Sequence, residues 1–184
     1  MPQAMRAPGP QQQMGLSEIA SEFKRLDEKR RQHGLSLGEA GRYNALFTQL
    51  SDALTAGERH RRVDLRQFLR VRSRLELIVR TRAGEIKTAC RDFGGGGCAI
   101  ESPALFELGG DVYLDGAVLE GKRFPLHGRA VVAWARLPTT VTAGHGFGLK
   151  FAIESQEMRD QIDRLLYRVL DAFLHDDGGD ELAL

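Results

Sequence analysis

The sequence predicts an α+β protein in which an N-terminal helical hairpin precedes a six-stranded antiparallel β-barrel closed by a C-terminal helix. Before residue 57, two segments repeat apolar residues every three or four positions, as amphipathic helices do. From Val71 the pattern changes to alternation with a period of two, which is typical of half-buried strands. A broad apolar stripe at helical spacing returns after Ser155. This succession of patterns indicates the fold class.

Length and charge narrow the class of protein. The chain of 184 residues suits one core-bearing domain with an accessory element. Its 26 Lys and Arg nearly balance 25 Asp and Glu, so attraction for anions has to come from local clusters. No apolar stretch reaches the roughly 18 residues of a membrane span, and the first residues lack the apolar core of a secretory signal. We therefore expect a cytoplasmic protein with no membrane span.

Composition divides the chain into four predicted segments. Residues 1–14 are rich in Pro, Gln and Gly and are expected to form a disordered leader. Residues 15–57 are expected to form the helical hairpin, and residues 58–174 the barrel domain with its C-terminal helix. Residues 175–184 are acidic and contain glycine, which favours a flexible tail.

The two hairpin helices have recognisable starts. Ser17 is predicted to cap the first helix, and Ser36 with Glu39 forms a capping box at the start of the second. Each helix carries an apolar stripe that something must cover. We expect packing within the subunit, and the alternative is a homodimer through the same N-terminal helices.

Six short strands are predicted after residue 70, in meander order. They are expected at residues 71–80, 86–91, 98–100, 111–119, 124–137 and 147–153. Trp134 and Phe151 stand at strand positions with apolar neighbours and are predicted to belong to the core. Short antiparallel strands in this number favour a small barrel.

Candidate ligand-binding residues gather around the start of the first strand. The segment from residue 59 to residue 72 contains six arginines: Arg59, Arg61, Arg62, Arg66, Arg70 and Arg72. A guanidinium can grip a phosphate or a guanine edge at two points and can stack on a base. The glycine run at residues 94–97 would let a ligand approach the backbone closely. We therefore expect a small anionic ligand that carries guanine.

These residues resemble the PilZ domain, the bacterial receptor module for the cyclic dinucleotide c-di-GMP. That family is marked by Arg-x-x-x-Arg just before the first strand and by (Asp or Asn)-x-Ser-x-x-Gly about one hairpin later. Here Arg66 and Arg70 match the first motif, while Asp92 and Gly97 match the second, with Gly94 in place of the serine. The resemblance covers about residues 59 to 173, so the helical hairpin lies outside it.

The resemblance implies a c-di-GMP site made by the motif residues. Arg66 and Arg70 would bind phosphate oxygens or guanine O6 and N7, and Asp92 would accept the N1–H and N2–H of a guanine. Gly97 would let the loop turn against the ligand. The hydroxyl missing at Gly94 removes a hydrogen bond worth about 0.5 to 1.5 kcal/mol, which should weaken binding without abolishing it.

The choice among the arginines depends on where the strand begins. Arg62, Arg66, Arg70 and Arg74 each stand four positions apart, so other pairs fit the same spacing, but Arg70 immediately precedes the alternating strand. Arg61 and Arg62 are then auxiliary phosphate contacts. Plainer interpretations stay open, because arginines before a strand often form a solvated linker and Asp92 would in that case only cap a turn.

The implied function is a non-enzymatic receptor. In it c-di-GMP orders the arginine-rich segment, changes the orientation of hairpin and barrel, and so signals to an unidentified protein partner. The first alternative is a degenerate PilZ-fold adaptor that does not bind c-di-GMP and acts through protein contacts in motility or pilus assembly. General nucleic-acid binding is disfavoured by the net charge of +1 and by the lack of an aromatic stacking row.

No pattern predicts catalysis or a metal. The five histidines show no metal-ligand spacing, and Cys90 and Cys98 are expected to be reduced strand residues. The glycines precede a strand, and no Gly-Lys-Ser/Thr completes a phosphate loop. We expect neither an enzyme nor a metal or cofactor, with c-di-GMP as the only small ligand.

Overall fold

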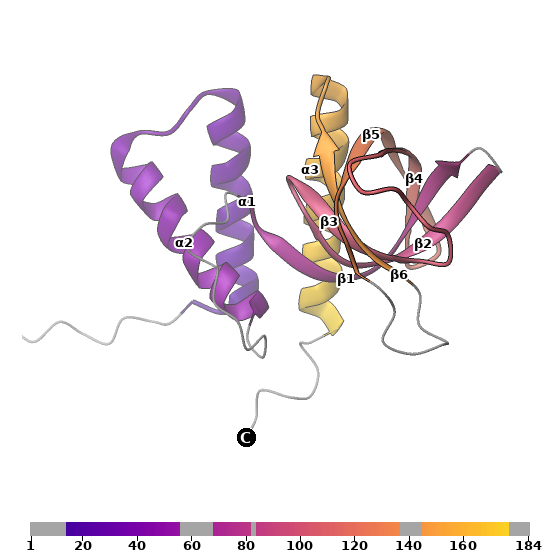
Figure 1. Cartoon of the computed structure of the whole chain (residues 1–184). Coiled ribbons are helices and arrows are strands. Elements are labelled where there is room, and N and C mark those ends of the chain that lie inside the picture. Colours follow the sequence, from indigo (N-terminus) through magenta and orange to yellow (C-terminus); the bar gives the residue numbers. More distant parts are fainter. Residues whose placement is uncertain (1–13, 56–67, 82–83, 137–144, 177–184) are drawn as a thin grey trace, which may run out of the picture. The chain divides into compact units, whose positions relative to one another are not determined.

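The computed structural model describes residues 14–55, 68–81, 84–136 and 145–176. The chain divides into two compact units, Met1–Leu50 and Ser51–Leu184. The described residues form two N-terminal helices, a closed antiparallel barrel of six strands, and a C-terminal helix (Figure 1). The predicted fold class is therefore confirmed. The domain boundary predicted at residue 57 lies outside the described residues and stays a prediction.

Two helices form the hairpin, α1 at Leu16–Gln32 and α2 at Leu37–Thr55. The apolar repeat predicted for α1 buries Ala20, Phe23 and Leu26. The Phe23 ring stacks on the Tyr43 ring of α2, with the ring centroids 5.1 Å apart. The two apolar stripes thus contact each other inside one subunit.

The helix starts confirm one prediction and correct another. At α2 the backbone N–H of Glu39 donates to Ser36 Oγ at 3.4 Å, and the backbone N–H of Ser36 donates to the Glu39 carboxylate at 3.1 Å, as the capping box requires. At α1 the predicted cap at Ser17 is wrong, because the N-cap is Gly15. The Glu18 carboxylate accepts the Gly15 N–H at 3.0 Å and faces the first turn, so no hydroxyl is needed there.

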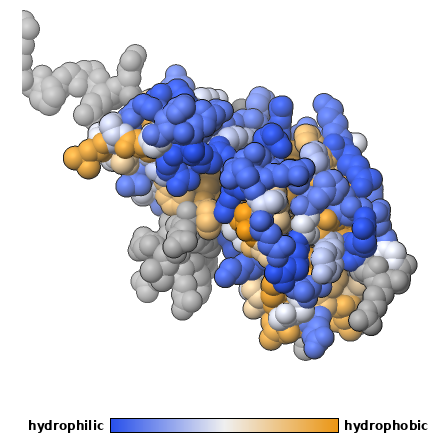
Figure 2. Space-filling view, turned by 90° about the horizontal axis from the view of Figure 1, so that it is seen from above, coloured by the Kyte–Doolittle hydropathy of each residue, from blue (hydrophilic) through white to orange (hydrophobic). Residues whose placement is uncertain are grey.

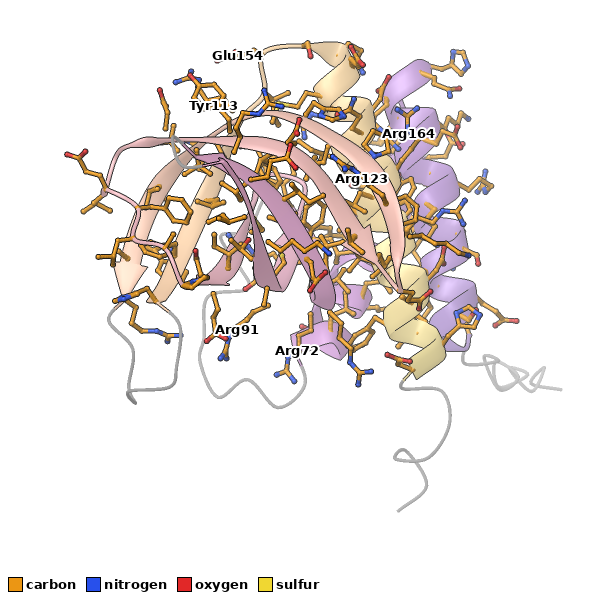
Figure 3. The ribbon with its side chains drawn as sticks, turned by 90° about the vertical axis from the view of Figure 1, so that its right-hand side faces the viewer. Arg72, Arg91, Tyr113, Arg123, Glu154 and Arg164 are labelled. Atoms are coloured by element: carbon orange, nitrogen blue, oxygen red, sulfur yellow. The ribbon has the colours of Figure 1, made fainter. Side chains whose placement is uncertain are left out.

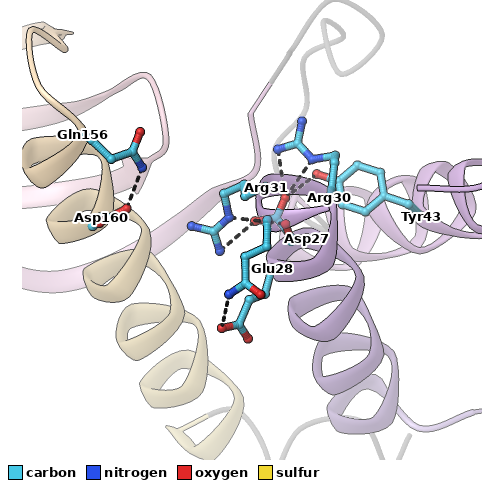
Figure 4. Close-up of polar contacts among 8 residues, drawn as sticks. Asp27, Glu28, Arg30, Arg31, Tyr43, Gln156 and Asp160 are labelled. Carbon is cyan, nitrogen blue, oxygen red and sulfur yellow. Dashed lines mark hydrogen bonds and ion pairs between the residues drawn. The ribbon is translucent and has the colours of Figure 1, made fainter. Parts of the chain in front are cut away.

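A buried carboxylate, Asp27, links the two helices (Figure 4). It accepts hydrogen bonds from Arg30 at 2.9 Å and from the Tyr43 hydroxyl at 3.0 Å, and Arg31 pairs with it at 3.4 Å. Burial and then the Asp27 charge raise the pKa of Tyr43, so its hydroxyl remains a donor. These contacts compensate the burial of a charged group in a small hairpin.

Six strands build the barrel in the second unit. They are β1 at Arg70–Thr81, β2 at Gly84–Gly94, β3 at Gly97–Ser102, β4 at Asp111–Leu119, β5 at Lys122–Arg136 and β6 at His145–Ala152. Their order around the barrel is β1-β2-β3-β6-β5-β4, and each neighbouring pair is antiparallel. The expected meander order is therefore corrected. The connection after β3 takes the chain to the other side of β1, and closure through β1–β4 and β3–β6 leaves no unpaired edge.

The C-terminal helix α3, Gln156–Asp176, lies along one side of the barrel (Figure 1). Its predicted apolar stripe is buried except for Phe173 near the end of the helix, which is half-buried. The buried members are Met158, Ile162, Leu165, Leu166, Val169 and Leu170. A polar contact fixes the helix on β5, because Gln161 Oε1 accepts the backbone N–H of His127 at 2.8 Å. The helix therefore completes the hydrophobic core of this unit, as the sequence predicted.

Hydrophilic side chains cover much of the face shown in Figure 2, with smaller apolar patches among them. Phe151 is buried as predicted, but the prediction that Trp134 belongs to the core is wrong, since it is 41% exposed. A register shift between Val132 and Trp134 in the β5–β6 pairing explains the difference, because a bulge moves the following side chains to the other face. Among the described residues, no helix combines the length and apolarity needed to cross a membrane.

Candidate ligand-binding site

The glycine run forms the tight turn of the β2–β3 hairpin. Gly94 ends β2, Gly97 begins β3 opposite it, and Gly95 and Gly96 make the turn between them. The Gly96 carbonyl accepts the backbone N–H of Phe151 of β6 at 3.1 Å, which ties the turn to the barrel. The four glycines are thus a folded corner of the barrel.

Two predicted site residues, Arg70 and Asp92, contact each other at this corner. Arg70 is the first residue of β1 and pairs in register with Gly94. Its Nη1 donates to Asp92 Oδ1 at 3.0 Å, and the two side chains remain 39% and 30% exposed. Among the described residues neither side chain has another polar partner. Since a guanidinium has five N–H donors and a carboxylate about four lone-pair sites, both keep most of their hydrogen-bonding capacity for a ligand.

The structure explains why position 94 has no side chain. A Cβ at Gly94 would lie 2.6 Å from the carbonyl oxygen of Leu69 and 3.0 Å from Cγ of Arg70. Contacts this short would force the start of β1 away from the turn. The serine of the family motif is therefore incompatible with the close approach of β1 seen in this chain.

Gly97 also has a structural reason to be glycine. Its φ is +158°, and a Cβ there would lie 2.1 Å from the carbonyl oxygen of Leu149 in β6. The residue permits the close β3–β6 pairing that closes the barrel. A role for Gly97 in contacting a ligand stays a prediction.

The remaining predicted site residues cannot be placed. Arg61, Arg62 and Arg66 lie outside the described residues. The described chain resumes at Phe68, two residues before Arg70. The corner therefore assembles Arg70, Asp92, Gly94 and Gly97 of the predicted set.

Two residues that sequence reasoning did not select also lie at the corner. Phe68 packs against Gly95 and Gly96, and Arg159 of α3 donates from Nη1 to the Gly95 carbonyl at 3.0 Å. Arg159 Cζ lies 5.6 Å from the centroid of the Phe68 ring. Phe68 falls between the two motif arginines, but nothing local in the sequence connects Arg159 with residues so far away along the chain.

The cysteines below the turn show no sign of nucleophilic activation. Cys90 and Cys98 are free and buried. A hydrogen bond with Cys90, and then burial, raise the pKa of the Cys98 thiol well above its usual range, which opposes thiolate formation. Among the described residues, no group of three or more His, Cys, Asp or Glu could hold a metal ion.

Comparison with known proteins identifies the family of the barrel domain. The family model of the PilZ domain matches residues 64–168. The PilZ domain of YcgR from Escherichia coli, in a structure with c-di-GMP, has a TM-score of 0.50 at 11% identity and covers 64% of this chain and 100% of that chain. No curated protein gave a significant match.

Two longer proteins are similar to this chain over part of their length. MrkH from K. pneumonia, in a c-di-GMP complex, gives a TM-score of 0.49 at 17% identity, covering 64% of this chain and 57% of that chain. The inhibitor of motility MotI/DgrA from Bacillus subtilis gives 0.48 at 19% identity, covering 60% and 54% respectively. The match of the family model over more than half of the sequence, with the barrel and the glycine corner, shows that this chain belongs to the PilZ domain family.

Proposed function

We propose that this protein is a non-enzymatic receptor for c-di-GMP and that the ligand binds at the corner formed by Arg70, Asp92 and the glycine turn. The contact between Arg70 and Asp92 carries the proposal. It brings a guanidinium and a carboxylate together at a partly exposed position beside a turn made of glycines. Family membership supports the ligand, because the PilZ domain of YcgR compared above was solved with c-di-GMP.

The chemistry of the two side chains suits the two parts of this ligand. The free donors of Arg70 can bind a phosphate oxygen or the O6 and N7 acceptors of guanine. The free oxygen of Asp92 can accept the N1–H and N2–H of a guanine. The ion pair holds both groups in place before the ligand arrives, which lowers the entropy that binding has to overcome.

The output of the receptor is a change in protein contacts. Arg66, with Arg61 and Arg62 as auxiliary contacts, closes on the phosphates and thereby couples the ligand to the orientation of the helical hairpin relative to the barrel. A ligand can shift such an equilibrium only by its difference in affinity for the two arrangements. The new arrangement presents a surface to a protein partner in the cytoplasm.

Calorimetric titration of the full chain with c-di-GMP tests the proposal. We expect the parent protein to bind, and Arg66→Ala, Arg70→Ala and Asp92→Ala each to lose about ten- to a hundredfold in affinity, because hydrogen bonds to charged groups are worth about 1.5 to 3 kcal/mol. Arg91→Ala is the matched control. Arg91 lies in the same hairpin, pairs with Glu101, and extends from the edge of the barrel in Figure 3.

Two results would contradict the proposal. Absence of binding by the parent at high micromolar c-di-GMP would favour the adaptor function, in which the PilZ fold acts through protein contacts alone. Equal binding by the parent and all three site variants would show that the ligand binds elsewhere.

A further inference from the structure

An aromatic side chain covers the glycine turn. The Phe68 ring reaches both turn residues, because a Cβ at Gly95 would lie 2.9 Å from its Cδ1 and a Cβ at Gly96 would lie 2.8 Å from its Cδ2. Any side chain at either position would displace the ring. The two glycines thus offer a bare backbone surface that a planar ring can cover.

A guanidinium from α3 flanks the same ring. Arg159 Cζ is 5.6 Å from the ring centroid, within the range of a cation–π contact, and Nη1 is anchored on the Gly95 carbonyl at 3.0 Å. Among the described residues, Arg159 forms no ion pair with a carboxylate. Most of its five N–H donors are therefore available to a ligand at the corner where Arg70 and Asp92 meet.

The Phe68 ring is partly exposed to solvent in this position. It is 39% exposed, whereas Leu69, the next residue, is 4% exposed and anchors the start of β1. Replacing a half-exposed ring by another planar ring conserves contact with the backbone and with the guanidinium. A guanine base can replace the Phe68 ring in this way. It would interact more strongly with Arg159, because a guanidinium can stack on the base or donate to its O6 and N7, acceptors that phenylalanine lacks.

We propose that the Gly95–Gly96 backbone and Arg159 form a seat for one guanine base, and that Phe68 occupies this seat until the ligand displaces it. The proposal rests on the proposed function for the identity of the ligand. It adds a ligand contact from α3 and makes Phe68 an internal competitor of the base. The apparent affinity is then reduced by the fraction of molecules in which the ring covers the seat.

Titration of the full chain with c-di-GMP tests both residues. We expect Phe68→Ala to raise the affinity roughly three- to tenfold by removing the competitor. Arg159→Ala should lower it roughly tenfold, and Arg159→Lys should restore little, since an ammonium keeps the charge but loses the planar fork. Arg168→Ala is the control. Arg168 lies on α3 about 180° around the helix axis from Arg159, so its loss should leave the affinity unchanged.

Two further measurements separate ligand contact from a merely structural role. The preference for c-di-GMP over c-di-AMP should fall in Arg159→Ala, because adenine presents a donor where guanine has O6. In a Phe68→Trp, Trp134→Phe double variant, the single indole should change its emission on saturation with c-di-GMP as it leaves the turn. Circular dichroism establishes that each variant is folded.

The outcomes distinguish this inference from the proposed function. If the parent binds and loses affinity on Arg70→Ala, but Phe68→Ala and Arg159→Ala bind like the parent, the receptor function stands and the seat is refuted. A loss of affinity in Phe68→Ala would make the ring a platform for the base and would overturn displacement. If the parent does not bind, binding by Phe68→Ala would support the internal competitor, and no binding by either would overturn both proposals.

Discussion

Strand β1 carries two arginine–aspartate pairs, one near each end, that differ in what surrounds them. Near its start, Arg70 contacts Asp92 of β2 at 3.0 Å. Near its end, Arg80 contacts Asp115 of β4 at 2.9 Å. The residue types and distances are nearly the same, so these features alone do not identify a ligand site.

The difference lies in the second partner of each carboxylate. Asp115 also faces His127 Nδ1 at 3.4 Å and Arg123 Nη2 at 4.0 Å. Hydrogen bonds with Glu85 and then with Arg80 lower the pKa of Asp115. Asp92 has Arg70 as its only side-chain partner among the described residues, and the glycine turn lies beside it. A carboxylate with several protein partners supports structure, whereas one with a single partner can accept a ligand.

The largest expected difference between the Arg70–Asp92 and Arg80–Asp115 pairs is in ligand affinity. We expect Asp92→Asn to lower c-di-GMP affinity about ten- to a hundredfold, because the proposed acceptor for guanine N–H groups loses its charge. Asp115→Asn, the same change at the other end of β1, should alter the affinity less than twofold, within about 0.4 kcal/mol. Calorimetry measures both, and equal losses would mean that the surroundings of the two pairs do not matter.

A smaller effect concerns the backbone at the Asp92 end. Gly94→Ser restores the family motif, yet we expect it to lower the free energy of unfolding by about 1 to 2 kcal/mol, because the Cβ would collide with the Leu69 carbonyl. Gly146→Ser is a suitable control in β6, where the nearest atom to a Cβ is the flexible Arg136 Nε at 3.5 Å. Denaturant unfolding measures both. A Gly94→Ser protein that is as stable as the parent and binds c-di-GMP more tightly would contradict this expectation. It would show that the start of β1 can move to admit the side chain and that the serine hydroxyl contributes to binding.

The smallest expected effect is the pH dependence of the Asp115 pair. Its folded pKa lies below the ordinary value of 3.8, so its contribution to stability is present above that value and is lost as the pH falls through the folded pKa. The difference in unfolding free energy between the parent and Asp115→Asn should therefore shrink in acid. Urea unfolding from neutral pH down to about pH 3 measures it. If the difference in unfolding free energy between the parent and Asp115→Asn stays constant over this range, the charge of Asp115 does not stabilise the fold.

The sequence predicted the elements well because their signals are local. The alternation from Val71, the Ser36–Glu39 capping box and the stripe on α3 each involve residues within a few positions of one another. Predictions from local patterns were wrong at two places, a bulge in a strand and the start of a helix. The bulge before Trp134 turned an apparently buried residue outward, and the Glu18 carboxylate replaced the expected cap at Ser17.

The candidate site was predictable only in part. The motif residues Arg70 and Asp92 are 22 positions apart and meet because β1 and β2 form a hairpin, which local patterns anticipate. Arg159 and Gly95 are 64 positions apart and meet only when α3 packs on the closed barrel. The need for glycine at position 94 likewise depends on how closely β1 approaches the turn.

By itself, then, the sequence determined the kinds of elements, their order along the chain and the family motifs, since periodicity and short spacings encode these directly. Only the tertiary structure decided the order of strands around the barrel, the partners of each aspartate and the meeting of Phe68 with Arg159. The physical reason is that such contacts depend on barrel closure and helix packing, which join residues whose separation along the chain carries no local signal.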